Sequence, residues 1–223
     1  NRKLFAMEQL LEAMNANWEG HEALRTQILR QGHFFGNDDP MADALAQRIV
    51  LSIDSIKKRI QSPAMNTFVC GSFVGATHPN IILGKKMPAS PDGRFAAEEL
   101  AMGVSQTGGK DKNGVTALLK SISSLDYSKF CGCLVSNLKL SPQMADTPEK
   151  RGRIAQMFHA FLMRGGMQLQ INYVSGEELR KAQITPEEYE NLMVRVTGYS
   201  GYFTLFDQDL QNDIIKRTEH QHA

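Results

Sequence analysis

The sequence lacks the features that are typical of disulfide-rich, membrane-spanning, secreted and nucleic-acid-binding proteins. It holds three cysteines in 223 residues, a small and odd number that argues against a disulfide framework and for a reducing compartment. No apolar run approaches the roughly 20 residues that cross a bilayer, and no signal-peptide pattern is present. The formal net charge of +1 gives no electrostatic reason to expect nucleic acid or a membrane surface as a partner. These absences predict a cytoplasmic protein.

Helical and strand patterns alternate along the chain. Helical spacing predicts two helices separated by Gly20, and then a helix capped by Asp39 with Pro40 at its first position. That helix carries one apolar stripe, formed by Met41, Leu45, Ile49, Ile53, Ile56 and Ile60. Further helices are expected at about 115–125, after Thr147, and at about 208–217; strands are expected at 66–74, 131–140 and 167–174. Such alternation predicts parallel strands with helices outside, in an α/β sheet or barrel.

The strand "MQLQINYV" (167–174) has the clearest alternation. Its apolar face is formed by Met167, Leu169, Ile171 and Tyr173. Its other face is rich in amides, which suits a polar lumen or a packed polar layer. Two capping boxes follow, at Ser175 and Thr185, and each predicts a short helix. In the helix after Thr147 we expect Ile154, Met157, Phe158, Phe161 and Leu162 to face the core.

For several candidate motifs, an ordinary structural role is a better interpretation than a binding site. Cys131 and Cys133 could begin a metal site, but no second pair completes it, so buried strand thiols are the better account. "GGKDKNG" (108–114) lacks the Lys-Ser/Thr ending of a phosphate loop. His78, in the Gly- and Pro-rich stretch 75–114, could reach a ligand, although a solvated loop histidine is the simpler interpretation. We expect no metal site.

The run "VRVTGYSGYF" (194–203) is β-rich and contains no acid, histidine or cysteine. Gly198 is by itself a turn glycine, because glycine tolerates unusual backbone angles. The residues around Gly198, however, resemble the signature of a known family. Arg195, Val196, Thr197, Gly198 and Tyr199 resemble the Arg-Val-x-Gly-Tyr signature of the glycyl radical enzymes, the family of pyruvate formate-lyase and the diol and choline lyases.

Other segments resemble the same family in the same order. They are "FGNDDP" (35–40), "SPDGRFAAEELAMGVS" (90–105), "GKDKNGVTALLKSISSLD" (109–126) and "MQLQINYVSGEELRKAQITPEEY" (167–189). The resemblance covers nearly the whole chain. "DGRFAAEELA" and "GYSGYF" are closer to the dehydratase and carbon–heteroatom lyase branch than to pyruvate formate-lyase, while aryl acetate decarboxylases and fumarate-adding synthases share much of the pattern.

The resemblance implies that Gly198 stores a backbone radical, with Arg195, Val196, Thr197, Tyr199 and Ser200 as its loop. A glycine suits this role because a planar radical carbon would bring a side chain into its neighbours. No permanently bound cofactor is implied: a separate activating enzyme with S-adenosylmethionine and an iron–sulfur cluster installs the radical. The family passes the radical to a cysteine that then attacks a small substrate. Thr77 and His78 could border the substrate pocket.

The family's catalytic cysteine has no counterpart here. Cys70, Cys131 and Cys133 lie in segments that resemble other parts of the family, so we expect the cysteine outside this chain. The chain is then the C-terminal portion of an oxygen-sensitive anaerobic lyase or dehydratase, completed by an N-terminal half or a second polypeptide. Its first residue is not methionine, which favours a fragment. The alternative is a spare-part protein that repairs an oxygen-cleaved enzyme.

The implied fold is the C-terminal part of a ten-stranded α/β barrel that ends in a glycyl radical subdomain. A change of composition near Ser175 divides the chain into residues 1–174, with a long loop system at 75–114, and residues 175–223. The complete enzyme is expected to be a homodimer. Its partners are the activating enzyme and the cysteine-bearing portion, with no nucleic acid and no membrane.

Overall fold

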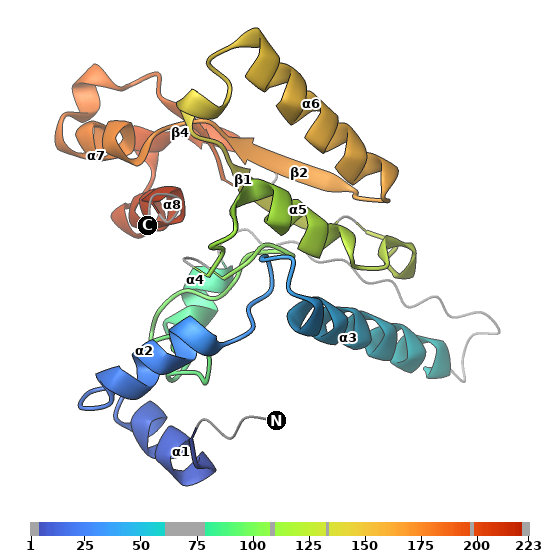
Figure 1. Ribbon diagram of the computed structural model, residues 1–223. Helices are drawn as coiled ribbons and strands as arrows, with labels where there is room; N and C mark the ends of the chain where they lie inside the picture. The colour runs from blue at the N-terminus through green and yellow to red at the C-terminus, as the bar shows by residue number, and fades with distance from the viewer. Residues whose placement is uncertain (1–4, 61–78, 108–109, 133, 197–198, 220–223) are drawn as a thin grey trace. The chain divides into compact units, whose positions relative to one another are not determined.

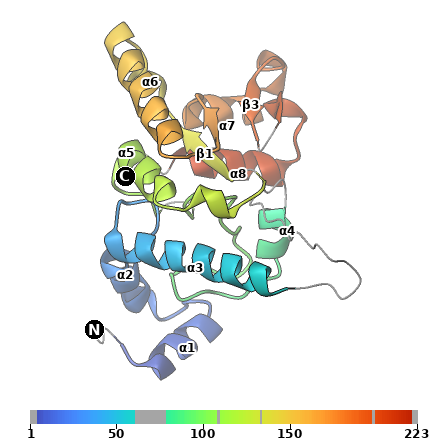
Figure 2. The ribbon, with the colours of Figure 1, turned by 90° about the vertical axis from the view of Figure 1, so that its right-hand side faces the viewer.

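The computed structural model describes residues 5–60, 79–107, 110–132, 134–196 and 199–219. Its elements are shown in Figure 1, and Figure 2 shows them turned by 90°. The α-helices are α1 (Met7–Asn15), α2 (Glu22–Gln31), α3 (Pro40–Arg59), α4 (Pro79–Gly84), α5 (Gly114–Ser123), α6 (Pro148–Met163), α7 (Gly176–Ile184) and α8 (Gln208–Glu219). The strands are β1 (Val135–Lys139), β2 (Gln168–Asn172), β3 (Met193–Arg195) and β4 (Ser200–Tyr202).

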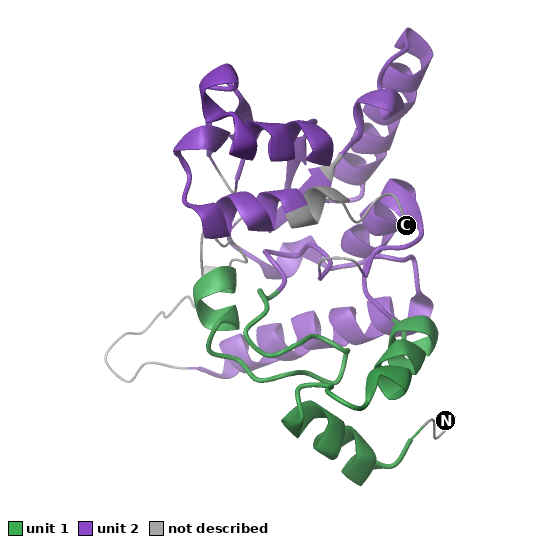
Figure 3. Cartoon of the chain, turned by 90° about the vertical axis from the view of Figure 1, so that its left-hand side faces the viewer, with its two compact units in different colours: residues 1–33, 78–100 green, residues 34–77, 101–223 purple. Residues whose placement is uncertain are grey.

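The chain forms two compact units, coloured separately in Figure 3. Unit 1 comprises residues 1–33 and 78–100, and unit 2 comprises residues 34–77 and 101–223. Unit 1 contains α1, α2 and α4, and unit 2 contains the remaining helices and all four described strands. The candidate radical loop therefore belongs to unit 2.

Unit 1 is organised around one tryptophan. Trp18 is fully buried with Leu10, Leu24 and Ile28, and its indole N–H donates a hydrogen bond of 3.0 Å to the Arg94 carbonyl. Arg94 is itself buried and donates to the carbonyl oxygens of Pro88, Phe95 and Glu98. A guanidinium with several fixed donors can satisfy carbonyl groups that irregular backbone leaves unpaired. Arg94 thus orders part of the 75–114 stretch, in which the sequence had not predicted the helix α4.

Unit 2 holds a parallel strand pair joined by a helix. β1 and β2 pair in parallel with α6 between them in sequence, and Leu138 shares a core with Leu118 of α5 and Phe161 of α6. The predicted parallel strands with outer helices are confirmed for this pair. The predicted strand at 66–74 lies outside the described residues. The described strands form a two-stranded parallel sheet and a two-stranded antiparallel sheet, in which no barrel is visible.

Gly103 shows how closely the loop before α5 approaches β1. Its φ is +61°, and an added Cβ would lie 2.2 Å from the Val135 carbonyl oxygen. The N–H of the next residue, Val104, donates to that same oxygen. Only glycine fits this combination of backbone angle and close approach.

The N-cap of α3 is confirmed, and the apolar stripe of this helix is exposed in the described structure. Asp39 accepts from the N–H groups of Met41 and Ala42. The stripe from Met41 to Ile60 is exposed, with relative accessibilities from 41% to 66%. The inward face instead uses Val50 together with polar contacts, such as the hydrogen bond from the Asp126 N–H to the Gln47 side chain.

Two smaller expectations fail, at Leu162 and at the Thr185 cap. Leu162 of α6 is exposed, and Phe161 is the buried residue at this point of the helix. Ile171 of β2 and the flanking Met167 and Tyr173 are also exposed, whereas Leu169 on the same face packs against the core. The Thr185 hydroxyl donates to the Lys181 carbonyl instead of capping a new helix, and a single 3-10 turn follows at Pro186–Glu188. The Ser175 cap is confirmed by its bond to the Glu178 N–H.

Candidate functional site

The site predicted around Gly198 is carried by a short antiparallel hairpin. β3 pairs with β4 in a register that places Arg195 opposite Ser200 and Val194 opposite Gly201. Alternation along the chain turns Val194 and Val196 inward, and Val196 is 1% exposed. Phe203, directly after β4, is completely buried and its N–H donates to the Leu192 carbonyl at 2.8 Å. The hairpin is therefore anchored by apolar side chains on one face.

The described ends of the candidate loop meet at a hydrogen bond. The Val196 N–H donates to the Tyr199 carbonyl with an N–O distance of 3.0 Å. The Arg195 guanidinium reaches the Ser200 hydroxyl at 3.3 Å, which links the two strands again by side chains. Thr197 and Gly198 lie between these points in the sequence and outside the described residues. The structure thus brings together the described residues of the predicted loop, Arg195, Val196, Tyr199 and Ser200.

A side-chain amide holds the hairpin against the end of β2. Asn172 accepts from the Arg195 N–H at 2.7 Å and donates to the Arg195 carbonyl at 2.6 Å. The carboxamide thereby does for β3 what a neighbouring strand would do, satisfying both peptide groups of one residue. Asn172 was not among the residues predicted for the site. The sequence feature that points to Asn172 is its place as the last amide on the polar face of β2.

Two helices support the hairpin from residues 175–219. Buried Leu179 of α7 and buried Leu210, Ile214 and Ile215 of α8 belong to these packed helices. The Gln183 side chain donates across the pair to the side chains of Gln211 and Asn212. Gln211 in turn donates to the Phe203 carbonyl, which joins α8 to the end of the hairpin. Leu210, Ile214 and Ile215 thus form the buried face of α8, in the place where the sequence predicted the last helix.

The two tyrosines of the hairpin, Tyr199 and Tyr202, are exposed. Tyr199 is 38% exposed and makes an edge-to-face contact with Phe206, with ring centroids 6.5 Å apart. Tyr202 is also exposed. The run 194–203 contains valine, tyrosine and phenylalanine, all of which could exclude water from a buried centre. Within this chain, the valines and Phe203 fill that role and the two tyrosines do not.

The polar face of the parallel sheet is partly buried. Asn137 and Gln170 are register partners on β1 and β2, and Gln170 is 2% exposed. The side-chain amide atoms of both residues are buried and make no hydrogen bond with any of the described residues. Asn172 lies on the same face two residues further along β2. The amide-rich face is thus partly buried and is not an open solvent-facing surface, as the sequence pattern predicted.

Among the other candidate residues, Thr77, His78, Cys70 and Cys133 lie outside the described residues. Cys131 is exposed and precedes β1, so the buried strand thiol expected there is wrong. The described residues contain no group of three His, Cys, Asp or Glu side chains arranged to hold a metal ion. Among them, no helix is both long and apolar enough to span a bilayer.

Comparison with known families identifies two regions of the chain. Residues 1–73 match the family model described as "Pyruvate formate lyase-like", and residues 100–204 match the one described as "Glycine radical". The second region includes the β3–β4 hairpin and both helices that flank β1. The chain belongs to the glycyl radical enzymes of the pyruvate formate-lyase-like family.

Individual relatives place the chain in the dehydratase and lyase branch. It is 33% identical to the trans-4-hydroxy-L-proline dehydratase of Clostridioides difficile, over 98% of this chain and 27% of that protein. It is 34% identical to the isethionate sulfite-lyase of Oleidesulfovibrio alaskensis, over 98% of this chain and 26% of that protein. The glycerol-bound B12-independent glycerol dehydratase from Clostridium butyricum matches with a TM-score of 0.88 and 29% identity, over 99% of this chain and 28% of the other. The chain thus spans about a quarter of the length of these relatives, and aligns with their C-terminal part.

Proposed function

We propose that Gly198 stores a backbone radical for a lyase or dehydratase reaction, and that residues 175–223 form its glycyl radical subdomain. The support is the hairpin: buried Val194 and Val196 anchor its first strand and buried Phe203 follows its second. The Val196–Tyr199 hydrogen bond joins the described chain on either side of the Thr197–Gly198 pair. Asn172 adds a second anchor on Arg195. These contacts fix the described chain on both sides of the proposed radical position.

The proposed chemistry begins with one hydrogen atom. An S-adenosylmethionine- and iron–sulfur-dependent activating enzyme takes a hydrogen atom from the Gly198 Cα, and the unpaired electron stays on that carbon. The adjacent peptide nitrogen donates electron density to the planar carbon and the carbonyl withdraws it. In turnover, a cysteine S–H returns a hydrogen atom to Cα, and the sulfur then carries the unpaired electron. We place this cysteine outside the chain, in a further polypeptide portion that completes the ten-stranded α/β barrel.

The role of this chain's own residues is positioning and exclusion. Val194, Val196 and Phe203 keep water from the inward face of the hairpin, which protects a reactive centre from side reactions. Arg195 and Ser200 hold the strands in register through their side chains. Tyr199 is exposed and its ring packs edge-to-face on Phe206. Thr77 and His78 remain proposed residues of the substrate pocket border.

The proposed substrates are small organic molecules that lose water or another heteroatom group. The named relatives include a hydroxyproline dehydratase, a glycerol dehydratase and a sulfite-lyase, and this favours elimination over decarboxylation or addition to fumarate. We further propose a cytoplasmic location and a homodimeric complete enzyme. A spare-part role is less well supported, because the chain also contains all of unit 1 and the β1–β2 sheet, which a replacement glycine loop does not need.

Electron paramagnetic resonance tests the storage role directly. The chain, together with the polypeptide portion that completes it, is incubated without oxygen with a glycyl radical activating enzyme, S-adenosylmethionine and a reductant. We expect a doublet signal that Gly198→Ala abolishes. The matched control is Gly152→Ala in α6, where an added Cβ meets no atom within 4 Å, and this variant should keep the doublet. A doublet that persists in Gly198→Ala, or its absence from the unaltered chain, contradicts the proposal.

Exposure to air gives an independent test. Oxygen attack at the radical carbon should cut the activated chain at Gly198 and leave a shortened product in denaturing mass spectrometry. An unchanged mass after exposure of a sample with a strong doublet contradicts the assignment. Co-purification with a large cysteine-bearing polypeptide supports the divided enzyme, whereas restored activity of a cleaved enzyme supports the spare-part alternative.

A further inference from the structure

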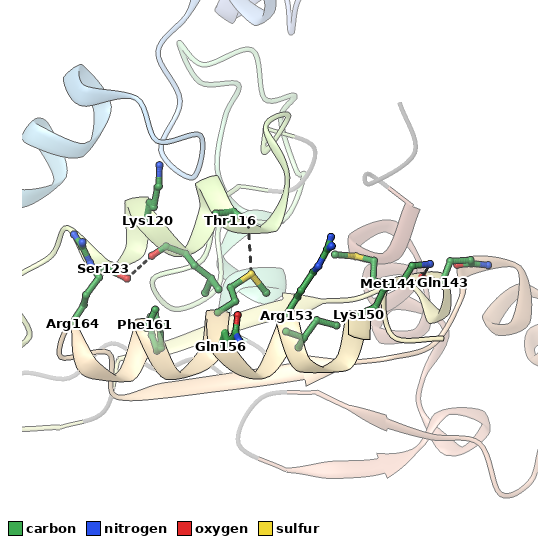
Figure 4. A pocket seen from close by; sticks show the side chains of 14 residues that line it. Thr116, Lys120, Ser123, Gln143, Met144, Lys150, Arg153, Gln156, Phe161 and Arg164 are labelled. Atoms are coloured by element: carbon green, nitrogen blue, oxygen red, sulfur yellow. Dashed lines mark hydrogen bonds between the residues drawn. The ribbon is translucent and has the colours of Figure 1, made fainter. Parts of the chain in front are cut away.

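A cavity in unit 2 lies along α5 and α6, on the side of these helices shown in Figure 4. Its volume is about 740 Å³. Its apolar lining comes from both helices and the turn before α6: Leu119, Met144, Ile154, Met157, Ala160 and Phe161. We call this feature the α5–α6 groove. It is separate from the hairpin that carries the candidate radical loop.

The walls of the groove follow helical spacing. The α5 wall contains Thr116, Leu119, Lys120 and Ser123, and the α6 wall runs from Lys150 to Arg164. At a rise of about 1.5 Å per residue, the α6 wall is about 21 Å long. Two helices that present residues at spacings of three and four form a channel into which the ridge of a third helix packs. The length corresponds to about four turns of such a helix.

The charges on the groove have one sign. Every ionisable residue that lines it is a base, namely Lys120, Lys150, Arg153 and Arg164. Three of them form ion pairs with Asp38, Asp146 and Glu149, and none of these acids lines the cavity. Exposed pairs of this kind contribute little and exchange readily for another anion. The groove therefore presents an apolar floor between positive charges.

We propose that the α5–α6 groove binds an amphipathic helix whose apolar stripe is bordered by aspartate or glutamate, contributed by polypeptide beyond the residues of this chain. Helix-in-groove binding uses apolar anchors at helical spacing, and Met144 and Met157 can adapt to their shape. The relatives are about four times as long as this chain, so further polypeptide is expected to cover part of its surface. The inference does not depend on the radical at Gly198.

Two labelled peptides test the groove with the full chain. The acidic probe is a helical peptide of about 18 residues with leucine at the a and d positions of its heptads and glutamate beside them. The basic probe has lysine in place of each glutamate. Fluorescence anisotropy should show the acidic probe binding at least about tenfold more tightly than the basic one, and salt should weaken its binding.

Charge reversal then locates the binding. Arg153→Glu combined with Arg164→Glu should weaken the acidic probe by at least about tenfold and strengthen the basic probe. The control is Arg151→Glu, on the same helix but outside the groove lining, which should change neither affinity by more than about twofold. Circular dichroism should give the same helix content for all variants.

Three results overturn the proposal. The first is no binding of the acidic probe, or binding that the double reversal leaves unchanged. The second is binding of dodecanoate in the groove without binding of the peptide, which assigns the groove to an acyl anion. The third is a concentration-dependent dimer in light scattering that Met157→Glu dissociates, which assigns the groove to a second copy of the chain. None of these results bears on the electron paramagnetic resonance test of Gly198.

Discussion

Asn172 forms two hydrogen bonds with the main chain of Arg195, one to its N–H and one to its carbonyl. Both N–O distances are below 2.8 Å, at 2.7 and 2.6 Å. The donor and the acceptor of one carboxamide thus match the two polar groups of one residue. Through this pair, the end of β2 holds the strand that leads toward Gly198.

Removing this carboxamide should loosen the hairpin. Asn172→Leu leaves two peptide groups of Arg195 without their partner, so we expect a loss of about 1–3 kcal/mol in the free energy of unfolding. Hydrogen exchange at the Arg195 amide should accelerate by about tenfold or more. Gln168→Leu, on the same face of β2, should leave this exchange rate unchanged. Slow exchange at Arg195 in Asn172→Leu would contradict the assigned role.

The second prediction concerns Gly201 in β4. An added Cβ would lie 2.5 Å from Cζ of Phe206, so Gly201→Ala must displace that ring. We expect a loss of about 1–3 kcal/mol in chemical unfolding, together with a change in the near-ultraviolet signal of the Tyr199–Phe206 contact. Phe206→Leu, added to Gly201→Ala, should restore much of the loss. Failure of the second substitution to do so would place the strain elsewhere.

The third prediction uses the single tryptophan of the sequence. Trp18 is buried in unit 1, so its fluorescence reports on that unit. Arg94→Lys leaves several carbonyl groups without a donor, because an ammonium cannot reproduce the guanidinium geometry. The free energy of unfolding obtained from the fluorescence transition in urea should fall by about 2–4 kcal/mol. Lys85→Arg, a change of cation in the same unit, should not shift it.

The fourth prediction is a pH dependence. Burial raises the pKa of Tyr127 from its ordinary value of 10.0 to about 12. Since the folded state favours the neutral phenol, this residue should reduce stability as the pH rises from 10 toward 12. Tyr127→Phe should therefore gain stability relative to the unaltered chain in that interval, and should lose the tyrosinate absorbance that develops near pH 12. Tyr202→Phe is the exposed control and should retain that absorbance. An unchanged absorbance near pH 12 in Tyr127→Phe contradicts the expected burial effect.

Local rules predicted much of the secondary structure. Asp39, Thr147 and Ser175 each cap the helix that the sequence assigned to them, because N-cap chemistry depends on the residue and its next three neighbours. Gly20 separates α1 from α2 with φ of +73°, again a property of one residue. The motif at 195–199 likewise predicted the family, since its residues are adjacent in the sequence.

Burial was harder to predict because it depends on what lies opposite. The stripe of α3 has the spacing of a core face, yet it is exposed in this chain. Met167 and Ile171 follow perfect alternation, yet the neighbouring Gln170 is the buried one. The Asn172–Arg195 pairing joins residues 23 positions apart, and no periodicity can reveal a bond between a side chain and distant backbone. Periodicity gives the faces of an element but not their neighbours.

The packing of α8 against α7 has a consequence for a chain that has been cut within the hairpin. A break between Val196 and Tyr199 leaves Leu210, Ile214 and Ile215 still buried, and the bridge from Gln183 to Gln211 and Asn212 stays intact. The two pieces should then travel together under native conditions and separate only when denatured. The cleaved chain should therefore have the same size as the intact chain under native conditions. Measurements of native size alone would not distinguish the two.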